Sequence, residues 1–116
     1  MRKAQISRYR TLLERQLAEL VGHGAATVHG MAREGDEIPD PNDRATREAD
    51  RNQELRMRDR DRKLIAKIQE ALARIEEGTF GRCAACGAAI DAARLRARPV
   101  TTLCIDCKRE AEAVER

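Results

Sequence analysis

Four cysteines form the pattern in this sequence that is best suited to chemistry. They lie at Cys83, Cys86, Cys104 and Cys107, in the order C-x2-C-x17-C-x2-C. Each C-x2-C pair lets two thiolates of one tight turn reach one ion, and two facing pairs supply a closed tetrahedron with Zn–S bonds of about 2.3 Å. Gly87 follows the first pair, where it allows the backbone to turn back with positive φ. The spacing predicts one structural zinc ion per chain.

The alternatives for these thiols are two disulfides, unmetallated buried thiols or a redox pair. The N-terminal sequence MRKAQISRYR lacks the apolar stretch of a signal peptide. No run approaches the roughly 20 apolar residues that cross a bilayer, so we expect a cytoplasmic protein with no membrane partner. Cysteines are reduced in the cytoplasm, which favours metal binding over disulfides. A four-thiolate site leaves no open position for water, so we expect a structural metal rather than a catalytic one.

Histidine ligands are not expected. The only histidines, His23 and His29, lie far from the cysteines in the sequence. We interpret both as ordinary residues on a helix surface.

A second cluster of ionisable residues is acidic and lies between residues 34 and 43. It contains five acids and no base: Glu34, Asp36, Glu37, Asp40 and Asp43. Gly35, Pro39 and Pro41 lie among these acids and break a helix. Asn42 or Asp43 could then cap a following helix, because a short side-chain oxygen satisfies free N–H groups of the first turn. Turn formation and capping are the simplest roles of these acids.

Two apolar patterns flank the acidic segment and predict the elements that position both clusters. Residues 4 to about 33 place apolar side chains at steps of three or four, which indicates one helix, although Gly22 and Gly24 weaken its middle. A second helix is expected from about 44 to 77, with a length of about 50 Å at roughly 1.5 Å per residue. Between Asp50 and Lys63 alternating charges suit a solvated helical face.

The prolines between the two helices force a reversal or a sharp break, so we predict an antiparallel helical hairpin, a coiled coil within one chain. A homodimeric coiled coil is the alternative. The expected fold is mainly α, with a hairpin over 1–77, an acidic tip at about 36–45 and a zinc-finger module over 78–116. The residues after Cys107 favour a short C-terminal helix packed on that module.

Length and composition limit both the core and the partners. The chain has 116 residues, of which 37% are charged and 2% aromatic. Its hydrophobic core is therefore small, and a fold with such a core usually needs additional stabilisation, for example from a metal ion. The net charge of +3 does not describe a strongly basic nucleic-acid binder. Arg94, Arg96 and Arg98 could nevertheless contact phosphates, which makes a zinc-ribbon nucleic-acid-binding protein the alternative function. The lack of aromatic residues on which bases could stack argues against single-strand binding.

Four segments carry a resemblance to a known family. They are IPDPNDRA (38–45), ELRMRDRDRKLIAKI (54–68), FGRCAACG (80–87) and RLRARPVTTLCIDCK (94–108). In combination they resemble the DksA/TraR family of RNA polymerase-binding regulators. The match has no apparent gaps from about residue 38 to the C-terminus and is looser through the first helix. It departs at the N-terminus, where the family carries an extra segment packed on the globular end and this chain starts near the first long helix.

The resemblance implies a bacterial regulator of transcription initiation that is not an enzyme. Family members insert the hairpin tip through the secondary channel of RNA polymerase, bind no promoter sequence, and destabilise open complexes at promoters such as those of ribosomal RNA. The tip motif D-x-x-D-x-A corresponds to Asp40, Asp43 and Ala45. We expect a monomer. Transcript-cleavage factors also present tip carboxylates, but theirs are adjacent, whereas here Pro41 and Asn42 separate the acids and disfavour cleavage.

The resemblance also implies a response to the alarmone guanosine tetraphosphate (ppGpp), which family members bind between themselves and the polymerase. The matching positions are Arg60, Lys67, Arg98 and Lys108. Guanidinium and ammonium groups suit phosphates through charge-assisted hydrogen bonds. The simpler interpretation is a solvated basic surface. Because the site is shared, we expect the chain alone to bind the nucleotide weakly.

Overall fold

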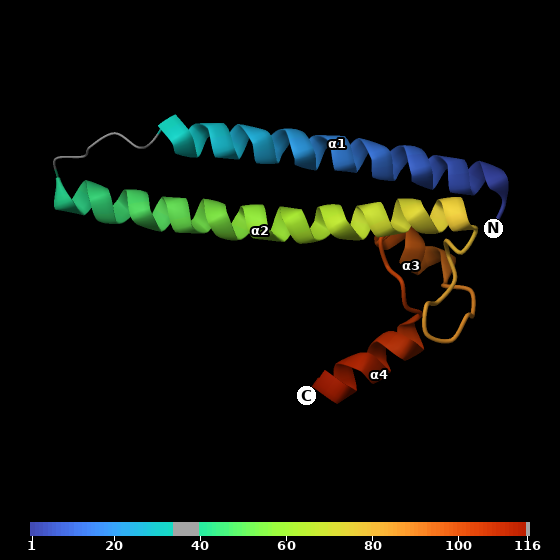
Figure 1. Ribbon diagram of the computed structural model, residues 1–116. Helices are drawn as coiled ribbons and strands as arrows, with labels where there is room; N and C mark the ends of the chain where they lie inside the picture. The colour runs from blue at the N-terminus through green and yellow to red at the C-terminus, as the bar shows by residue number, and fades with distance from the viewer. Residues whose placement is uncertain (34–39, 116) are drawn as a thin grey trace. The chain divides into compact units, whose positions relative to one another are not determined.

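The predicted mainly helical fold is confirmed. The computed structural model describes the backbone of residues 1–33 and 40–115 and the side chains of residues 1–23 and 40–115. Its helices are α1 (Lys3–Arg33), α2 (Pro41–Glu77), α3 (Ala92–Ala97) and α4 (Ile105–Glu115) (Figure 1). The predicted break over residues 34–39, three of its acids and the His29 side chain lie outside the described residues. None of the helices in the described part of the chain has an apolar stretch long enough to span a membrane.

The start of α2 corrects one prediction. The helix begins at Pro41, and not near residue 44, with Asp40 as its cap. The backbone N–H of Asn42 donates to Asp40 Oδ1 at 3.0 Å, and the N–H of Arg44 donates to the Asp40 carbonyl at 3.0 Å. The expectation that Asn42 or Asp43 would cap the helix was therefore wrong. Proline fits the first helical position because its missing N–H has no helical partner there and its fixed φ suits the helix.

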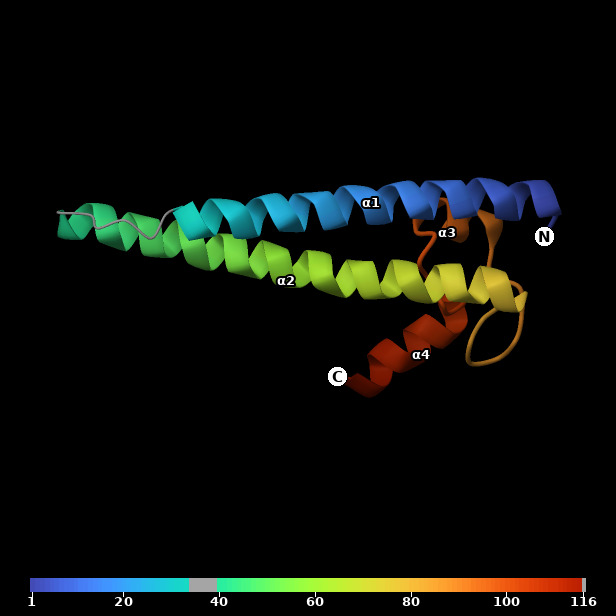
Figure 2. The ribbon, with the colours of Figure 1, turned by 45° about the horizontal axis from the view of Figure 1, so that its top comes forward.

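The chain divides into two compact units, and both helices of the hairpin contribute to each. Unit 1 comprises Met1–Gln16 and Lys67–Arg116, and unit 2 comprises Leu17–Ala66. Within unit 1, Arg10 Nη2 lies 2.9 Å from Glu76 Oε1. Within unit 2, His23 Nδ1 lies 3.5 Å from Asp61 Oδ2. In each unit, α1 and α2 therefore run antiparallel and pair within one chain, as the hairpin prediction requires (Figure 2).

The core lies in unit 1. Leu13, Ile68 and Leu95 are its largest fully buried side chains, and Phe80 joins them. The Phe80 ring lies 5.3 Å from the ring of Tyr9, tilted by 54°. Among the described side chains of unit 2 none is buried, in agreement with the alternating charges of α2. The core is thus small and sits beside the cysteines, where a metal ion adds the stability that apolar burial lacks.

The two short helices differ from expectation in their positions. No helix was predicted over α3, whose Leu95 inserts into the core. A C-terminal helix was predicted after Cys107, but α4 begins earlier, at Ile105, and includes that cysteine. No residue of α4 is buried and Val114 is 87% exposed, so the expected packing of this helix on the zinc module was wrong for its last turn.

Candidate functional site

The four cysteine sulfurs converge on one point. All four Sγ atoms lie within 4.8 Å of one another, and Cys86 Sγ lies 3.8 Å from Cys104 Sγ. A tetrahedron with Zn–S bonds of about 2.3 Å has sulfur–sulfur edges of about 3.8 Å, so the cluster has the right size for one Zn²⁺. Four thiolates close its coordination sphere, and the ion supplies folding energy rather than catalysis. The predicted structural zinc site is confirmed.

The first cysteine pair lies in a tight turn that depends on glycine. The N–H of Cys83 donates to the Ala88 carbonyl at 2.8 Å, and the N–H of Gly87 donates to the Cys83 carbonyl at 2.9 Å. Gly87 has φ of 76°, a region that side-chain-bearing residues avoid, which confirms the role predicted for it. These bonds fold the chain back, so that the thiols of Cys83 and Cys86 lie close enough together to share one ion.

The second cysteine pair is built on the start of α4. The N–H of Cys107 approaches Cys104 Sγ at 3.5 Å, and the N–H of Lys108 donates to the Cys104 carbonyl at 2.9 Å. The two turns are joined by the N–H of Ala84, which donates to the Thr102 carbonyl at 2.7 Å. This backbone bond ties the two cysteine turns to each other.

The thiols influence one another's ionisation. The backbone N–H of Cys104, followed by those of Cys86 and Ala85, lowers the pKa of Cys83 to about 6. Hydrogen bonding to the Cys104 side chain, and then to the other thiols, raises the pKa of Cys107. Without a cation the surroundings therefore favour the thiolate of Cys83 and disfavour that of Cys107. A divalent ion reverses this balance, because it stabilises all four thiolates.

These opposed pKa shifts predict that zinc binding weakens in acid. The Cys83 thiol is largely ionised at neutral pH, whereas Cys107 must release a proton when the metal binds. Binding therefore releases protons, and zinc affinity should fall continuously from about pH 8 to about pH 6. Competition with a chromophoric chelator across this range measures the effect. An affinity independent of pH would contradict a site made of thiolates.

Two arginines support the cysteine turns, and the sequence analysis missed both roles. Arg74 Nη2 donates to the Thr79 carbonyl at 3.3 Å and also to the Arg82 carbonyl. Arg94 Nε donates to the Leu103 carbonyl at 3.0 Å. Each arginine thus holds the residue directly before the first cysteine of a pair. Arg74 lies in the last turn of α2, where an arginine commonly bonds free carbonyls, so a signal for its role was present.

The position of Arg94, which was considered above as a possible phosphate contact, also gives it a structural role. The residue is half-buried and its guanidinium faces the backbone before Cys104. Its loss should loosen the second cysteine turn.

Arg94→Met is expected to weaken zinc binding by about tenfold, because residues that orient metal ligands typically contribute at least that much. The same change should lower stability by about 1.5 kcal/mol, the loss of one hydrogen bond from a charged donor. Arg96→Met on the same helix is the control, since Arg96 is exposed and holds no carbonyl in the described structure. Equal zinc affinities of the two variants would show that Arg94 does not support the site.

The predicted tip residues lie at the start of α2, in unit 2. Asp40, Asp43 and Ala45 are all exposed. The Asp40 carboxylate is engaged in capping the helix, whereas Asp43 lies within its first turn. The helix dipole favours negatively charged groups near a helix N-terminus, where both acids lie.

Three of the four predicted nucleotide-binding residues lie around the same cavity. Lys67, Arg98 and Lys108 line one small cavity of about 170 Å³ in unit 1, together with Glu70 and Arg94. Arg60 is exposed and belongs to α2 within unit 2. The cavity is therefore a basic site formed by three elements that are distant in sequence.

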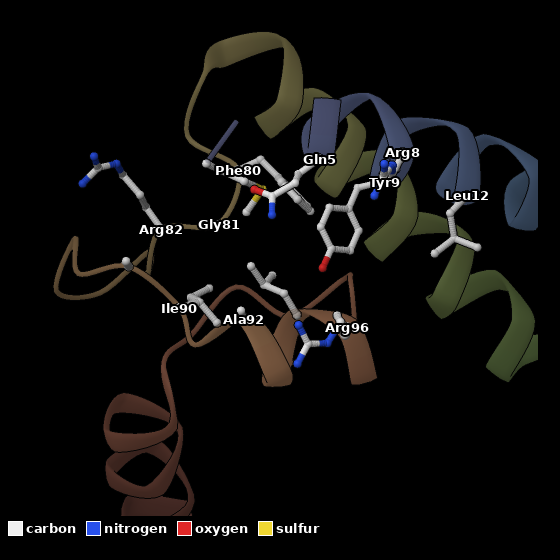
Figure 3. A pocket seen from close by; sticks show the side chains of 13 residues that line it. Gln5, Arg8, Tyr9, Leu12, Phe80, Gly81, Arg82, Ile90, Ala92 and Arg96 are labelled. Atoms are coloured by element: carbon white, nitrogen blue, oxygen red, sulfur yellow. The ribbon is translucent and has the colours of Figure 1, made fainter. Parts of the chain in front are cut away.

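A larger groove of about 740 Å³ in unit 1 was not foreseen (Figure 3). It lies between residues of α1 and α3 and the chain around Phe80. Its lining comprises Met1, Gln5, Arg8, Tyr9, Leu12, Phe80, Gly81, Arg82, Ala89, Ile90, Ala92, Leu95 and Arg96. The residues that line this groove include none of the four cysteines and none of the residues that line the basic cavity.

Two family models match the chain in sequence. The N-terminal domain of the DnaK suppressor protein DksA matches residues 5–75. The prokaryotic dksA/traR C4-type zinc finger matches residues 78–113, which contain all four cysteines. The second match agrees with the sulfur geometry described above.

Individual proteins are similar over the whole chain. The RNA polymerase-binding transcription factor DksA of Escherichia coli K12 is 45% identical over all of this chain and 77% of its own length, and that of Haemophilus influenzae is 43% identical over 80% of its length. The solved structure of transcription factor DksA2 from Pseudomonas aeruginosa superposes with a TM-score of 0.84 at 39% identity, covering 99% of this chain and 88% of that one. A Chlamydia trachomatis structure, at 21% identity and a TM-score of 0.61, shares the fold. These relatives are transcription factors rather than enzymes, and the chain belongs to the DksA/TraR family.

Proposed function

We propose that this protein is a bacterial transcription regulator that binds RNA polymerase. The observation that carries the proposal is the 45% identity, over the entire chain, to a protein named for binding RNA polymerase. The zinc cluster and the paired helices provide the same fold in this chain. We further propose that the protein acts in the cytoplasm, as a monomer that binds no specific DNA sequence.

The hairpin tip is the part that we propose to act on the polymerase, by entering its secondary channel. Asp40, Asp43 and Ala45 supply two carboxylates and a small apolar contact at the exposed start of α2. Charges placed near the active centre could destabilise open complexes at ribosomal RNA promoters. Asp40 also caps the helix, so its substitution would combine a functional loss with a structural cost of about 1 kcal/mol. Asp43 is therefore the cleaner probe.

A direct binding assay tests the proposal. Zinc-loaded protein immobilised on a resin should retain purified bacterial RNA polymerase, and the soluble protein should reduce transcription from a ribosomal RNA promoter in vitro. Binding without any effect on transcription would reject the regulatory role. Failure to retain the polymerase would reject the proposed function altogether.

We propose that the basic cavity receives the phosphates of ppGpp in the complex with polymerase. Lys67, Arg98 and Lys108 surround a space of about 170 Å³ that contains one acid, Glu70. Ligand pockets that enclose a whole small molecule usually measure about 300 Å³ or more, so this cavity suits a phosphate end and leaves the remainder of the nucleotide to the polymerase. A shared site of this kind explains why the isolated chain should bind ppGpp weakly.

The double change Lys67→Ala with Arg98→Ala should reduce the response to ppGpp more than the basal activity. Each lost charged hydrogen bond is worth about 1.5 kcal/mol or more, so the two losses together should raise the ppGpp concentration needed for half-maximal effect by about 100-fold or more. In vitro transcription over a ppGpp titration measures this shift. Arg15→Ala with Arg109→Ala is the control, because both residues are exposed and lie outside the cavity. An unchanged titration would remove the cavity residues from the nucleotide site.

A further inference from the structure

The groove between α1 and α3 presents two helical faces toward one space. Gln5, Arg8 and Leu12 come from α1 at spacings of three and four residues, which place them on one side of the helix. Ala92 and Leu95 come from α3 and follow the same spacing. A groove bounded by two helix faces is the form that receives a third helix in many protein complexes.

The floor of the groove is apolar and well packed. Leu95 and Phe80 are 1% and 8% exposed, and the Phe80 ring rests on Tyr9. Figure 3 shows the Tyr9 ring reaching into the groove, with its hydroxyl directed toward α3, on the side of Arg96. Leu12, in the same lining, is 40% exposed and supplies apolar surface above this floor. A fixed floor costs little conformational entropy when an apolar side chain binds over it.

The rim of the groove is basic. Arg8, Arg82 and Arg96 line it, and no acid does. Among the residues that the structure describes, Arg8 and Arg96 form neither ion pairs nor hydrogen bonds. An apolar floor between unpaired guanidinium groups complements a ligand that carries apolar side chains flanked by carboxylates.

We propose that this groove binds an acidic amphipathic helix of a partner protein. Apolar side chains at positions i, i+3, i+4 and i+7 would rest on Leu12 and Tyr9, above the buried floor, while carboxylates on its flanks pair with Arg8 and Arg96. The inference goes beyond the proposed function, because it requires neither the hairpin tip nor the basic cavity. The groove offers a second docking surface, because its lining shares no residue with the basic cavity.

Tyr9 provides a direct test. It is the only tyrosine and the chain has no tryptophan, so intrinsic fluorescence of the intact, zinc-loaded protein reports on the groove alone. The probe is a synthetic peptide of about 14 residues, about four helical turns, with leucines at the four anchor positions and glutamates on the flanks. Titration with it should give a saturable change in fluorescence. A peptide of the same pattern with lysine flanks should bind at least about tenfold more weakly.

The charge-reversed protein supplies the decisive comparison. Arg8→Glu with Arg96→Glu should reverse the preference, so that the lysine peptide binds better than the glutamate peptide. Arg15→Glu with Arg109→Glu makes the same change of net charge at exposed sites outside the groove and should keep the original preference. Equal binding of both peptides to the unaltered protein would overturn the proposal, as would an unchanged preference in the charge-reversed variant. A concentration-dependent dimer that the peptide dissociates would instead assign the groove to a second copy of the chain.

Discussion

Cys104→Ser is expected to abolish zinc binding and to unfold unit 1. The serine hydroxyl cannot replace a thiolate in a cluster whose sulfurs all lie within 4.8 Å of one another. Structural zinc contributes about 10 kcal/mol or more at neutral pH, which is comparable with the whole stability of a small domain, about 5–15 kcal/mol. The core beside Cys83 is too small to compensate, because only a few large side chains in it are fully buried.

Zinc content by mass spectrometry and thermal unfolding by circular dichroism measure this effect. Ala84→Ser is the matched control, because it introduces the same side chain at an exposed position of the first cysteine turn that does not hold the metal. The control should keep one zinc ion per chain and an almost unchanged melting temperature. If Cys104→Ser retained stoichiometric zinc and the same melting temperature, the ion would not be what stabilises this unit.

Asp43→Asn is expected to keep affinity for RNA polymerase and to lose most of the effect on transcription. The change removes one charge and no volume from the exposed first turn of α2, so the fold should be nearly unaffected. The lost interaction with the helix dipole should cost only about 0.3–1 kcal/mol of stability. Loss of function would therefore reflect the missing carboxylate at the polymerase.

Inhibition at a ribosomal RNA promoter, compared at equal polymerase occupancy, measures this loss. Asp50→Asn makes the same chemical change at an exposed position of the same helix and should inhibit like the unaltered protein. Inhibition by the Asp43 variant equal to that of this control would show that the tip carboxylate does not act. Reduced polymerase binding by the variant would mean that the residue serves in docking instead.

The features that the sequence predicted well are those that depend on neighbours along the chain. The spacing within each C-x2-C pair determines which sulfurs share a turn, and Gly87 permits that turn, so the zinc site followed directly. The helical periodicity likewise located α1 and the end of α2. The start of α2 was misplaced because Pro41 was treated as a helix breaker, although proline is well suited to the first helical turn.

The features that could not be predicted depend on contacts between distant segments. Arg94 resembles the exposed arginines near it in sequence, and only the fold places the Leu103 carbonyl within its reach. The basic cavity and the groove between α1 and α3 similarly join residues from separate elements. Amphipathic spacing indicates that a face will be covered, but it does not identify which element covers it or where a face is left open.

The entry of the hairpin tip into the polymerase is tested most directly by photo-crosslinking from the tip itself. A benzophenone amino acid in place of Asn42, between the two tip carboxylates, should crosslink to polymerase segments that line the secondary channel. The same group at Arg109, on exposed α4, should not reach those segments. Mass spectrometry of the crosslinked peptides identifies the contacts. Binding of the variant to the polymerase is verified separately. If the bound variant crosslinked from position 42 only to the outer surface of the polymerase, the proposed mechanism would be contradicted.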